Sequence, residues 1–172
     1  MVFSAVLYVT SAQWGKPIRR IAEGTVAFLP ISLLLFPLFF LGLDILFPWI
    51  HGPGRGLHVS IAEEKLFWLH APFHVVRDGI ALLILSGLSL VFVYYSLAGR
   101  ERTSRILSPI LLILYVLVYT LIAFDLVMAL DPQWISTLFG WYFFIGNFYA
   151  GLAAIAILAV IMRRRLHLED SI

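Results

Sequence analysis

The chain has 172 residues, of which 62% are apolar and 13% are charged, and its mean hydropathy is +0.97. A soluble globular domain is about half apolar and about one quarter charged, so this composition excludes that class. The sequence contains no cysteine. We therefore expect no iron–sulfur cluster, thiolate metal site, disulfide or covalently attached haem in this chain. We also expect no b-type haem, because no histidine lies in the middle of an apolar segment.

Four apolar segments are long enough to cross ~30 Å of hydrocarbon at ~1.5 Å per residue. We predict all-α structure: a polytopic membrane protein with one membrane domain over residues 1–172. A shorter apolar run over 2–12 comes first, and its length leaves open whether it ends a spanning helix or lies at the interface. The four predicted transmembrane helices cover about 24–47, 75–98, 108–130 and 136–162.

Basic residues are divided unequally between the two sides of this layout. Arg55, Lys65 and Arg77 fall on one side. The other side has Lys16, Arg19, Arg20, Arg100, Arg102, Arg105, Arg163, Arg164 and Arg165. Cytoplasmic loops carry the excess of Lys and Arg, so the second side is predicted to be cytoplasmic, together with the C-terminus. Because these clusters are split over short loops, we expect a lipid bilayer as partner and no nucleic acid.

The first predicted helix follows a connector over 11–23, SAQWGKPIRRIAE, which we expect to be cytoplasmic and to orient the chain at the headgroups. Pro30 and Pro37 free backbone carbonyls inside this helix and predict kinks that neighbouring groups must satisfy. Asp44 lies near the outer end of the helix.

The second predicted helix carries a line of polar side chains. At 100° per residue, His74, Asp78, Ser89 and Ser96 lie within about 60° of one another, with Arg77 one step round. Unpaired polar groups facing lipid are costly, so we expect this face to point toward protein or water. Two interpretations stay open: a site that handles protons, or a salt bridge from Arg77 or His74 to Asp78 that only fixes helix packing.

The third predicted helix begins at Ser108-Pro109, a capping residue followed by proline in the first turn. It ends at Asp131, because Pro132 disfavours helical geometry in its predecessor. Asp125 lies inside the apolar part of this helix, and an ionisable group there is a functional candidate by default.

The fourth predicted helix has a seam of small residues with one amide. Gly140, Asn147, Gly151 and Ala154 fall within about 60° on a helical wheel. Such seams let another helix approach closely, and Asn147 would hydrogen-bond across the contact.

The topology places the carboxylates Asp44, Asp78 and Asp125 in the outer half of the membrane, while the inner half is predicted to hold only hydroxyls. His70, His74, Asp131 and Gln133 lie at or just above the same level. Buried carboxylates beside histidines can accept protons from a reacting hydroxyl, as quinol oxidation requires. The same residues could instead form an ion or proton pathway, or a buried ionic network that keeps helices in register.

Three segments now support a family resemblance. The segment 124–151, FDLVMALDPQWISTLFGWYFFIGNFYAG, resembles the quinone-binding subunit 2 of bacterial alternative complex III, of the NrfD or polysulfide-reductase membrane-subunit class. The connector over 11–23 and the segment 65–79, KLFWLHAPFHVVRDG, are also similar to that family. The chain has about half the length expected for the family, and Gln133 stands where its motif has histidine.

The resemblance implies a membrane subunit of a quinol:electron-acceptor oxidoreductase in the bacterial cytoplasmic membrane, not catalytic alone. It implies a second NrfD-like membrane subunit, to which the quinol site is more readily assigned, and iron–sulfur and haem c subunits on the outer face. Two alternatives stay open: a structural membrane anchor without its own site, and a proton-translocating or transporter subunit. Under the leading hypothesis Asp125, Asp78 and His74 transfer protons, while Asp131, Gln133 and His70 lie near a quinone shared with the partners.

Overall fold

The structure is a computed structural model that describes residues 1–12, 14–47, 68, 71–131 and 134–162. Within these ranges the chain forms helices and no strand, which confirms the all-α prediction. The longer elements are α1 (Val2–Val9), α2 (Lys16–Gly24), α3 (Leu29–Phe40), α6 (Ala71–Leu97), α7 (Glu101–Ile122) and α8 (Phe139–Met162). The short ones are η1 (Thr25–Phe28), α4 (Leu43–Leu46), η4 (Ala123–Val127) and η5 (Met128–Leu130).

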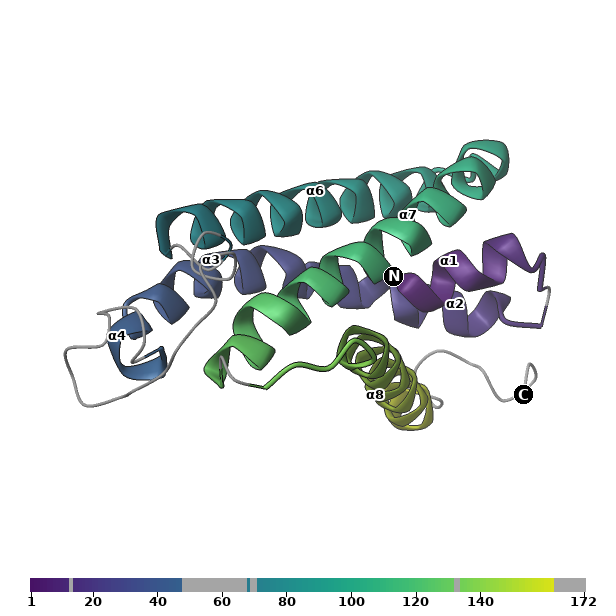
Figure 1. The fold of residues 1–172 in the computed structure, drawn as a ribbon. Helices are drawn as coiled ribbons and strands as arrows, with labels where there is room; N and C mark the ends of the chain where they lie inside the picture. The colour runs from purple at the N-terminus through teal and green to yellow at the C-terminus, as the bar shows by residue number, and fades with distance from the viewer. Residues whose placement is uncertain (13, 48–67, 69–70, 132–133, 163–172) are drawn as a thin grey trace.

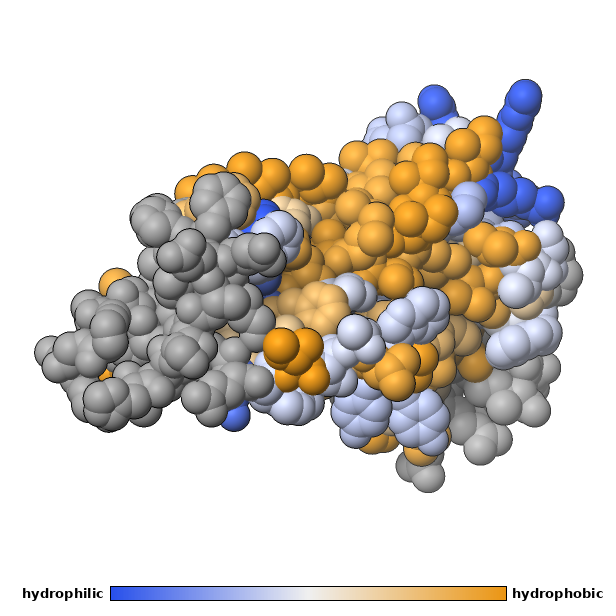
Figure 2. Space-filling model, in the orientation of Figure 1, coloured by the Kyte–Doolittle hydropathy of each residue, from blue (hydrophilic) through white to orange (hydrophobic). Residues whose placement is uncertain are grey.

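Four helical stretches in the described ranges are long and apolar enough to cross a membrane, so the chain is a multi-pass membrane protein. Their surfaces are apolar: the exposed fractions of Leu34, Ile113 and Val160 are 76%, 63% and 75%. On the face drawn in Figure 2, apolar residues cover most of the described surface. The four stretches are Ile18–Leu38, Phe73–Leu97, Glu101–Leu130 and Phe139–Met162.

Helices α6 and α7 run antiparallel and are joined by a tight turn (Figure 1). Gly99 has φ +71°, a left-handed conformation that glycine adopts without steric cost. Its N–H donates to the Ser96 carbonyl at 3.2 Å, and the Arg100 N–H donates to the Tyr95 carbonyl at 3.0 Å, closing the end of α6. Helix α8 packs against α7 and α2, and α3 packs against α6.

The turn between α1 and α2 lies at the same end of the bundle as the turn between α6 and α7 (Figure 1). The start of α6 and the segment that ends α7 lie together at the opposite end. Arg77 belongs to that opposite end. The other described basic residues belong to elements meeting at the first end: Lys16, Arg19, Arg20, Arg100, Arg102 and Arg105.

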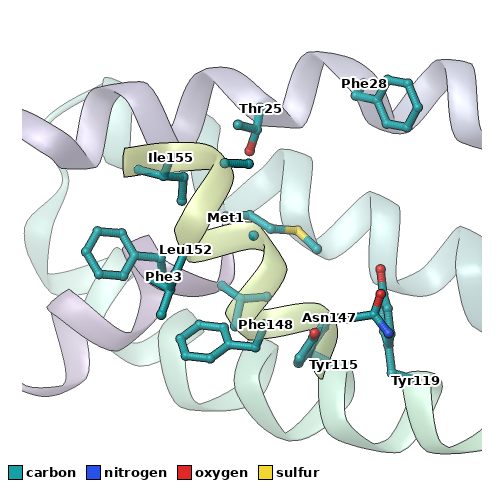
Figure 3. A pocket seen from close by; sticks show the side chains of 13 residues that line it. Met1, Phe3, Thr25, Phe28, Tyr115, Tyr119, Asn147, Phe148, Leu152 and Ile155 are labelled. Atoms are coloured by element: carbon teal, nitrogen blue, oxygen red, sulfur yellow. The ribbon is translucent and has the colours of Figure 1, made fainter. Parts of the chain in front are cut away.

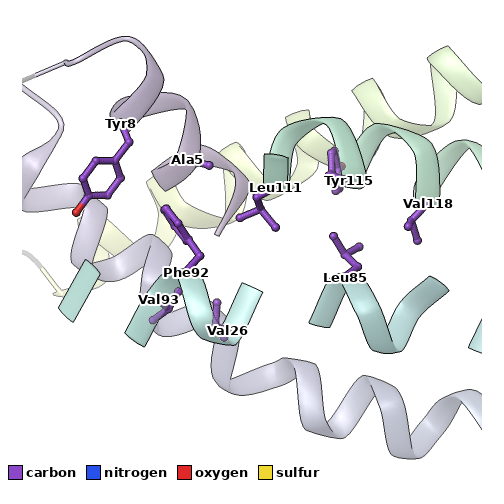
Figure 4. Packing of buried hydrophobic residues seen from close by; sticks show 9 residues of the cluster. All are labelled: Ala5, Tyr8, Val26, Leu85, Phe92, Val93, Leu111, Tyr115 and Val118. Carbon is purple, nitrogen blue, oxygen red and sulfur yellow. The ribbon is translucent and has the colours of Figure 1, made fainter. Parts of the chain in front are cut away.

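The buried apolar core joins α1 to α6 and α7 (Figure 4). Phe92 and Leu111 are fully buried, and the Tyr8 ring meets Phe92 edge to face with 5.7 Å between centroids. The short N-terminal run thus forms a helix that packs into this core. Its eight residues extend only ~12 Å.

The predicted start of the third helix is wrong. Helix α7 begins at Glu101, seven residues before Ser108. Ser108 does not cap the helix: its hydroxyl donates to the Ser104 carbonyl of the same helix at 2.6 Å. Pro109 sits inside α7, within two turns of its start.

The first predicted helix also starts too late, because α2 begins at Lys16 and continues through η1 into α3. Much of the predicted connector is thus helical. Helix α6 starts at Ala71, four residues before 75, while α8 starts at Phe139, three residues after 136. The predicted end at Asp131 is confirmed, because this residue has extended geometry after η5.

Candidate functional site

The candidate site lies where the start of α6 meets the end of α7. Helix α7 gives way to a wider π-helical turn, η4, and Asp125 lies in its middle with no exposed surface. Such turns interrupt the regular hydrogen-bond ladder and are frequent at functional sites. Helix α6 presents His74 and Asp78 one turn apart on one face, and both are fully buried.

Asp125 is bonded through both of its carboxylate oxygens. The Arg77 guanidinium donates to Oδ2 from Nη2 at 2.5 Å, and the Trp68 indole donates to Oδ1 from Nε1 at 2.8 Å. The guanidinium carbon also lies 3.9 Å from the centroid of the Trp68 ring, a cation–π distance. These two charge-assisted hydrogen bonds hold the Asp125 carboxylate in one orientation.

Asp78 has a different environment. His74 Nε2 lies 3.4 Å from its Oδ2, and Arg77 Nε lies 3.6 Å from its Oδ1. Both oxygens are buried, and neither accepts a hydrogen bond from any residue that the structure describes. The His74 ring is in turn packed edge to face on Phe47, with 5.9 Å between centroids.

The charges of this ionic cluster, defined as Trp68, His74, Arg77, Asp78 and Asp125, do not cancel. Two carboxylates face one permanent guanidinium charge, so the cluster has one excess negative charge when the imidazole is neutral. An uncompensated buried charge is costly. One added proton makes the cluster neutral, and the arrangement can therefore hold and exchange a single proton.

The structure brings together Asp125, Asp78 and His74, the three predicted proton-transfer residues. The predicted polar line on α6 is buried as expected, since Ser89 and Ser96 are also 0% and 1% exposed. Asp131 is exposed and follows η5, six residues after Asp125. His70 and Gln133, and the expectation for the Asp44 carboxylate, lie outside what the structure describes.

Sequence reasoning missed the central role of two residues. Arg77 was expected to flank the polar line or to pair with Asp78, and Trp68 was given no role in the site. Both contact Asp125 directly. The sequence did contain a signal for this role. A tryptophan and an arginine near the same helix end can stack on each other and bind the same acidic side chain.

The expectation that the inner half holds only hydroxyls is wrong. Glu23 is 2% exposed and lies inside the first span. Its Oε1 accepts hydrogen bonds from the hydroxyls of Ser4 at 2.9 Å and Ser96 at 2.5 Å. Arg19 and Arg20, at 3.6 and 3.0 Å, compensate its charge. The residue was assigned to a solvated connector, so its burial could not be predicted.

A cavity of about 400 Å³ lies between α1, η1, α7 and α8 (Figure 3). Tyr115, Tyr119 and Asn147 form its polar end, and no residue of the ionic cluster lines it. The Tyr115 hydroxyl donates to the Phe144 carbonyl at 3.1 Å, and the Asn147 amide donates to the Phe143 carbonyl at 2.8 Å. The cavity could hold an apolar ring that hydrogen-bonds at one edge.

The small-residue seam of α8 is split between two environments. A Cβ added at Gly140 would lie 2.5 Å from Thr120 Cγ2, so this glycine permits close approach of α7. Gly151 and Ala154 instead line the cavity, and Asn147 bonds to its own helix. The seam is thus a helix contact only at its first position. The Tyr115 and Tyr119 rings lie against each other, with 4.4 Å between centroids and 43° between their planes.

Among the described residues, no group of three His, Asp or Glu side chains is placed to hold a metal ion. Comparison of the chain with protein families, curated proteins and solved structures gives no match.

Proposed function

We propose that this chain is a membrane subunit of a quinol:electron-acceptor oxidoreductase, in which the ionic cluster transfers protons near the outer face. One observation carries the proposal. Two of the segments that resemble alternative complex III subunit 2 are far apart in the chain, yet they meet in this cluster. Asp125 comes from the segment 124–151, whereas Trp68, His74, Arg77 and Asp78 come from 65–79.

The chemistry of the reaction fits the charges of the cluster. Oxidation of one quinol to quinone releases two electrons and two protons. In the proposed complex the quinol binds mainly to the second NrfD-like subunit, and the electrons pass to iron–sulfur and haem c groups of outer-face subunits. The cluster accepts one proton at a time, becomes neutral, and releases it outward.

The proposed orientation follows from the basic residues. Arg19, Arg20 and Arg100 lie at the bundle end opposite the cluster. The end richer in Lys and Arg faces the cytoplasm in inner-membrane proteins. In the proposed orientation the cluster lies near the outer surface of the bacterial cytoplasmic membrane, and the C-terminus lies inside.

The decisive variant is Asp125→Asn in the assembled complex, with Glu101→Gln as the control because Glu101 is exposed on α7 at the opposite end. In Asp125→Asn the cluster is neutral without an added proton, so it should lose its proton exchange, and positioned acid–base groups contribute about a hundredfold or more to rate. We expect quinol oxidation to fall by about that factor in Asp125→Asn and to stay unchanged in the control. Normal turnover in a normally assembled Asp125→Asn complex would contradict the proposal.

A structural anchor is the second candidate, and one observation favours it: the bonds of Arg77 and Trp68 to Asp125 join α6 to the end of α7. An anchor requires the cluster for assembly only. In that case variants that assemble would oxidise quinol at the normal rate. Counting the protons released outside per electron separates quinol oxidation from a proton-translocating or transporter role, because only the latter releases more protons than the quinol supplies.

A further inference from the structure

A second concave region lies at the basic end of the bundle, between α2 and α8. This groove has a volume of about 330 Å³. Its lining combines apolar surface with a single charged side chain, Arg20, and consists of Arg20, Ile21, Gly24, Thr25, Leu158 and Met162. Both helices belong to stretches that are long and apolar enough to cross a membrane.

Arg20 is fixed at this groove by a buried carboxylate. Its Nη1 lies 3.0 Å from Glu23 Oε2, and the Glu23 side chain is 1% exposed. Glu23 is itself held by the hydroxyls of Ser4 and Ser96. The Arg20 side chain remains 49% exposed. A guanidinium has five N–H donors, so the contact with Glu23 leaves donors that can reach a ligand at the groove.

This end of the bundle has more positive than negative charge. The single carboxylate of Glu23 faces both Arg19 and Arg20. Arg19 is also stacked on Tyr8, with its guanidinium carbon 4.6 Å from the ring centroid. In the sequence, Met162 of the groove is followed directly by the three arginines at 163–165.

We propose that the groove binds an anionic phospholipid, with one acyl chain along Ile21, Leu158 and Met162 and the phosphate on Arg20. An apolar groove inside a spanning region suits an acyl chain. A guanidinium suits a phosphate because it offers parallel charge-assisted hydrogen bonds. Basic residues at the membrane surface attract anionic lipids. The site does not depend on the function proposed above.

The test is native mass spectrometry of the purified full chain in mild detergent, with phosphatidylglycerol or phosphatidylcholine added as the probe. The parent protein should retain phosphatidylglycerol in preference to phosphatidylcholine. Arg20→Gln should bind phosphatidylglycerol about fivefold more weakly, the loss expected for one basic residue. Arg102→Gln, an exposed arginine of α7 at the same end, is the matched control and should bind as the parent does.

A second variant tests the groove without changing charge. A Cβ added at Gly24 meets no atom within 4 Å, so Gly24→Leu fills the groove and leaves the helix packing intact. It should lose the bound phosphatidylglycerol. Gly146→Leu is the control, because Gly146 on α8 is equally open but does not line the groove, and this variant should keep the lipid. Parent-level retention in both Arg20→Gln and Gly24→Leu, or equal retention of the two lipids by the parent, would overturn the proposal.

Discussion

The guanidinium of Arg77 and the carboxylate of Asp125 form an ion pair across 48 positions of sequence. Their side chains are 15% and 0% exposed, so water does little to screen the pair. The contact ties the first turns of α6 to the π-helical turn that ends α7. The same guanidinium interacts more weakly with Asp78, because its Nε lies 3.6 Å from the nearer Asp78 oxygen.

Breaking this pair on one side should be strongly destabilising. Arg77→Gln leaves Asp125 buried without its counter-charge, and removal of one partner of a buried pair costs about 3–5 kcal/mol. We expect a loss of that size in the unfolding free energy of the purified chain in detergent. Arg77→Gln combined with Asp125→Asn should recover much of the loss, because no charge is then left unpaired. A double variant as unstable as Arg77→Gln alone would argue against the ion pair.

Trp68 should be needed for its indole N–H and not only for its ring. Trp68→Phe keeps an aromatic face for Arg77 but removes the donor to Asp125. A lost hydrogen bond to a charged group costs about 1.5–3 kcal/mol. We expect that decrease in stability in thermal unfolding. Trp141→Phe is the control, since Trp141 is 61% exposed, and it should unfold as the parent does.

Close packing of α8 on α7 should depend on Gly140. The Cβ of Gly140→Ala would lie 2.5 Å from Thr120 Cγ2, and a β-branched side chain has little freedom to move away. Overpacking costs about 1–3 kcal/mol. Gly146→Ala, with no atom near its Cβ, should be neutral or slightly stabilising. Adding Thr120→Ala to Gly140→Ala should restore stability; failure of this rescue would mean that another contact is limiting.

Ser96 should matter more than the other fully buried serine on its helix face. Its hydroxyl donates to Glu23 and contacts the Tyr8 hydroxyl at 2.9 Å. Ser96→Ala leaves a buried carboxylate short of a donor, which costs about 1–3 kcal/mol. Ser89 bonds only to the Leu85 carbonyl of its own helix, so Ser89→Ala should have little effect. Equal unfolding free energies for the two variants would contradict this assignment.

The parts of the fold that follow from local pattern could be predicted. The polar line of His74, Asp78, Ser89 and Ser96 is set by helical spacing alone, and the cost of facing lipid decides its direction. The end at Asp131 follows from the covalent geometry of the next proline. Asp125 stood out because an acid inside an apolar helix needs a partner.

The parts that depend on tertiary contact could not be predicted. A charged segment such as Glu101–Ser104 is equally compatible with loop and helix, so the local pattern does not decide that α7 begins at Glu101 and not at Ser108. Glu23 looks solvated in the sequence because the serines that bind it are 19 and 73 positions away. The partners of Asp125 are likewise distant in the sequence, because its two donors, Trp68 and Arg77, are 57 and 48 positions away.

The central claim is that the ionic cluster exchanges one proton during quinol oxidation, and that the proton binds to Asp78, whose buried oxygens accept no hydrogen bond from a described residue. Infrared difference spectroscopy of the assembled complex, recorded on addition of quinol, measures this directly. We predict a carbonyl-stretch signal from a protonated carboxylic acid that is lost in Asp78→Asn and kept in Glu101→Gln. A difference spectrum without such a signal, or one that is the same in Asp78→Asn as in the parent, would contradict the claim.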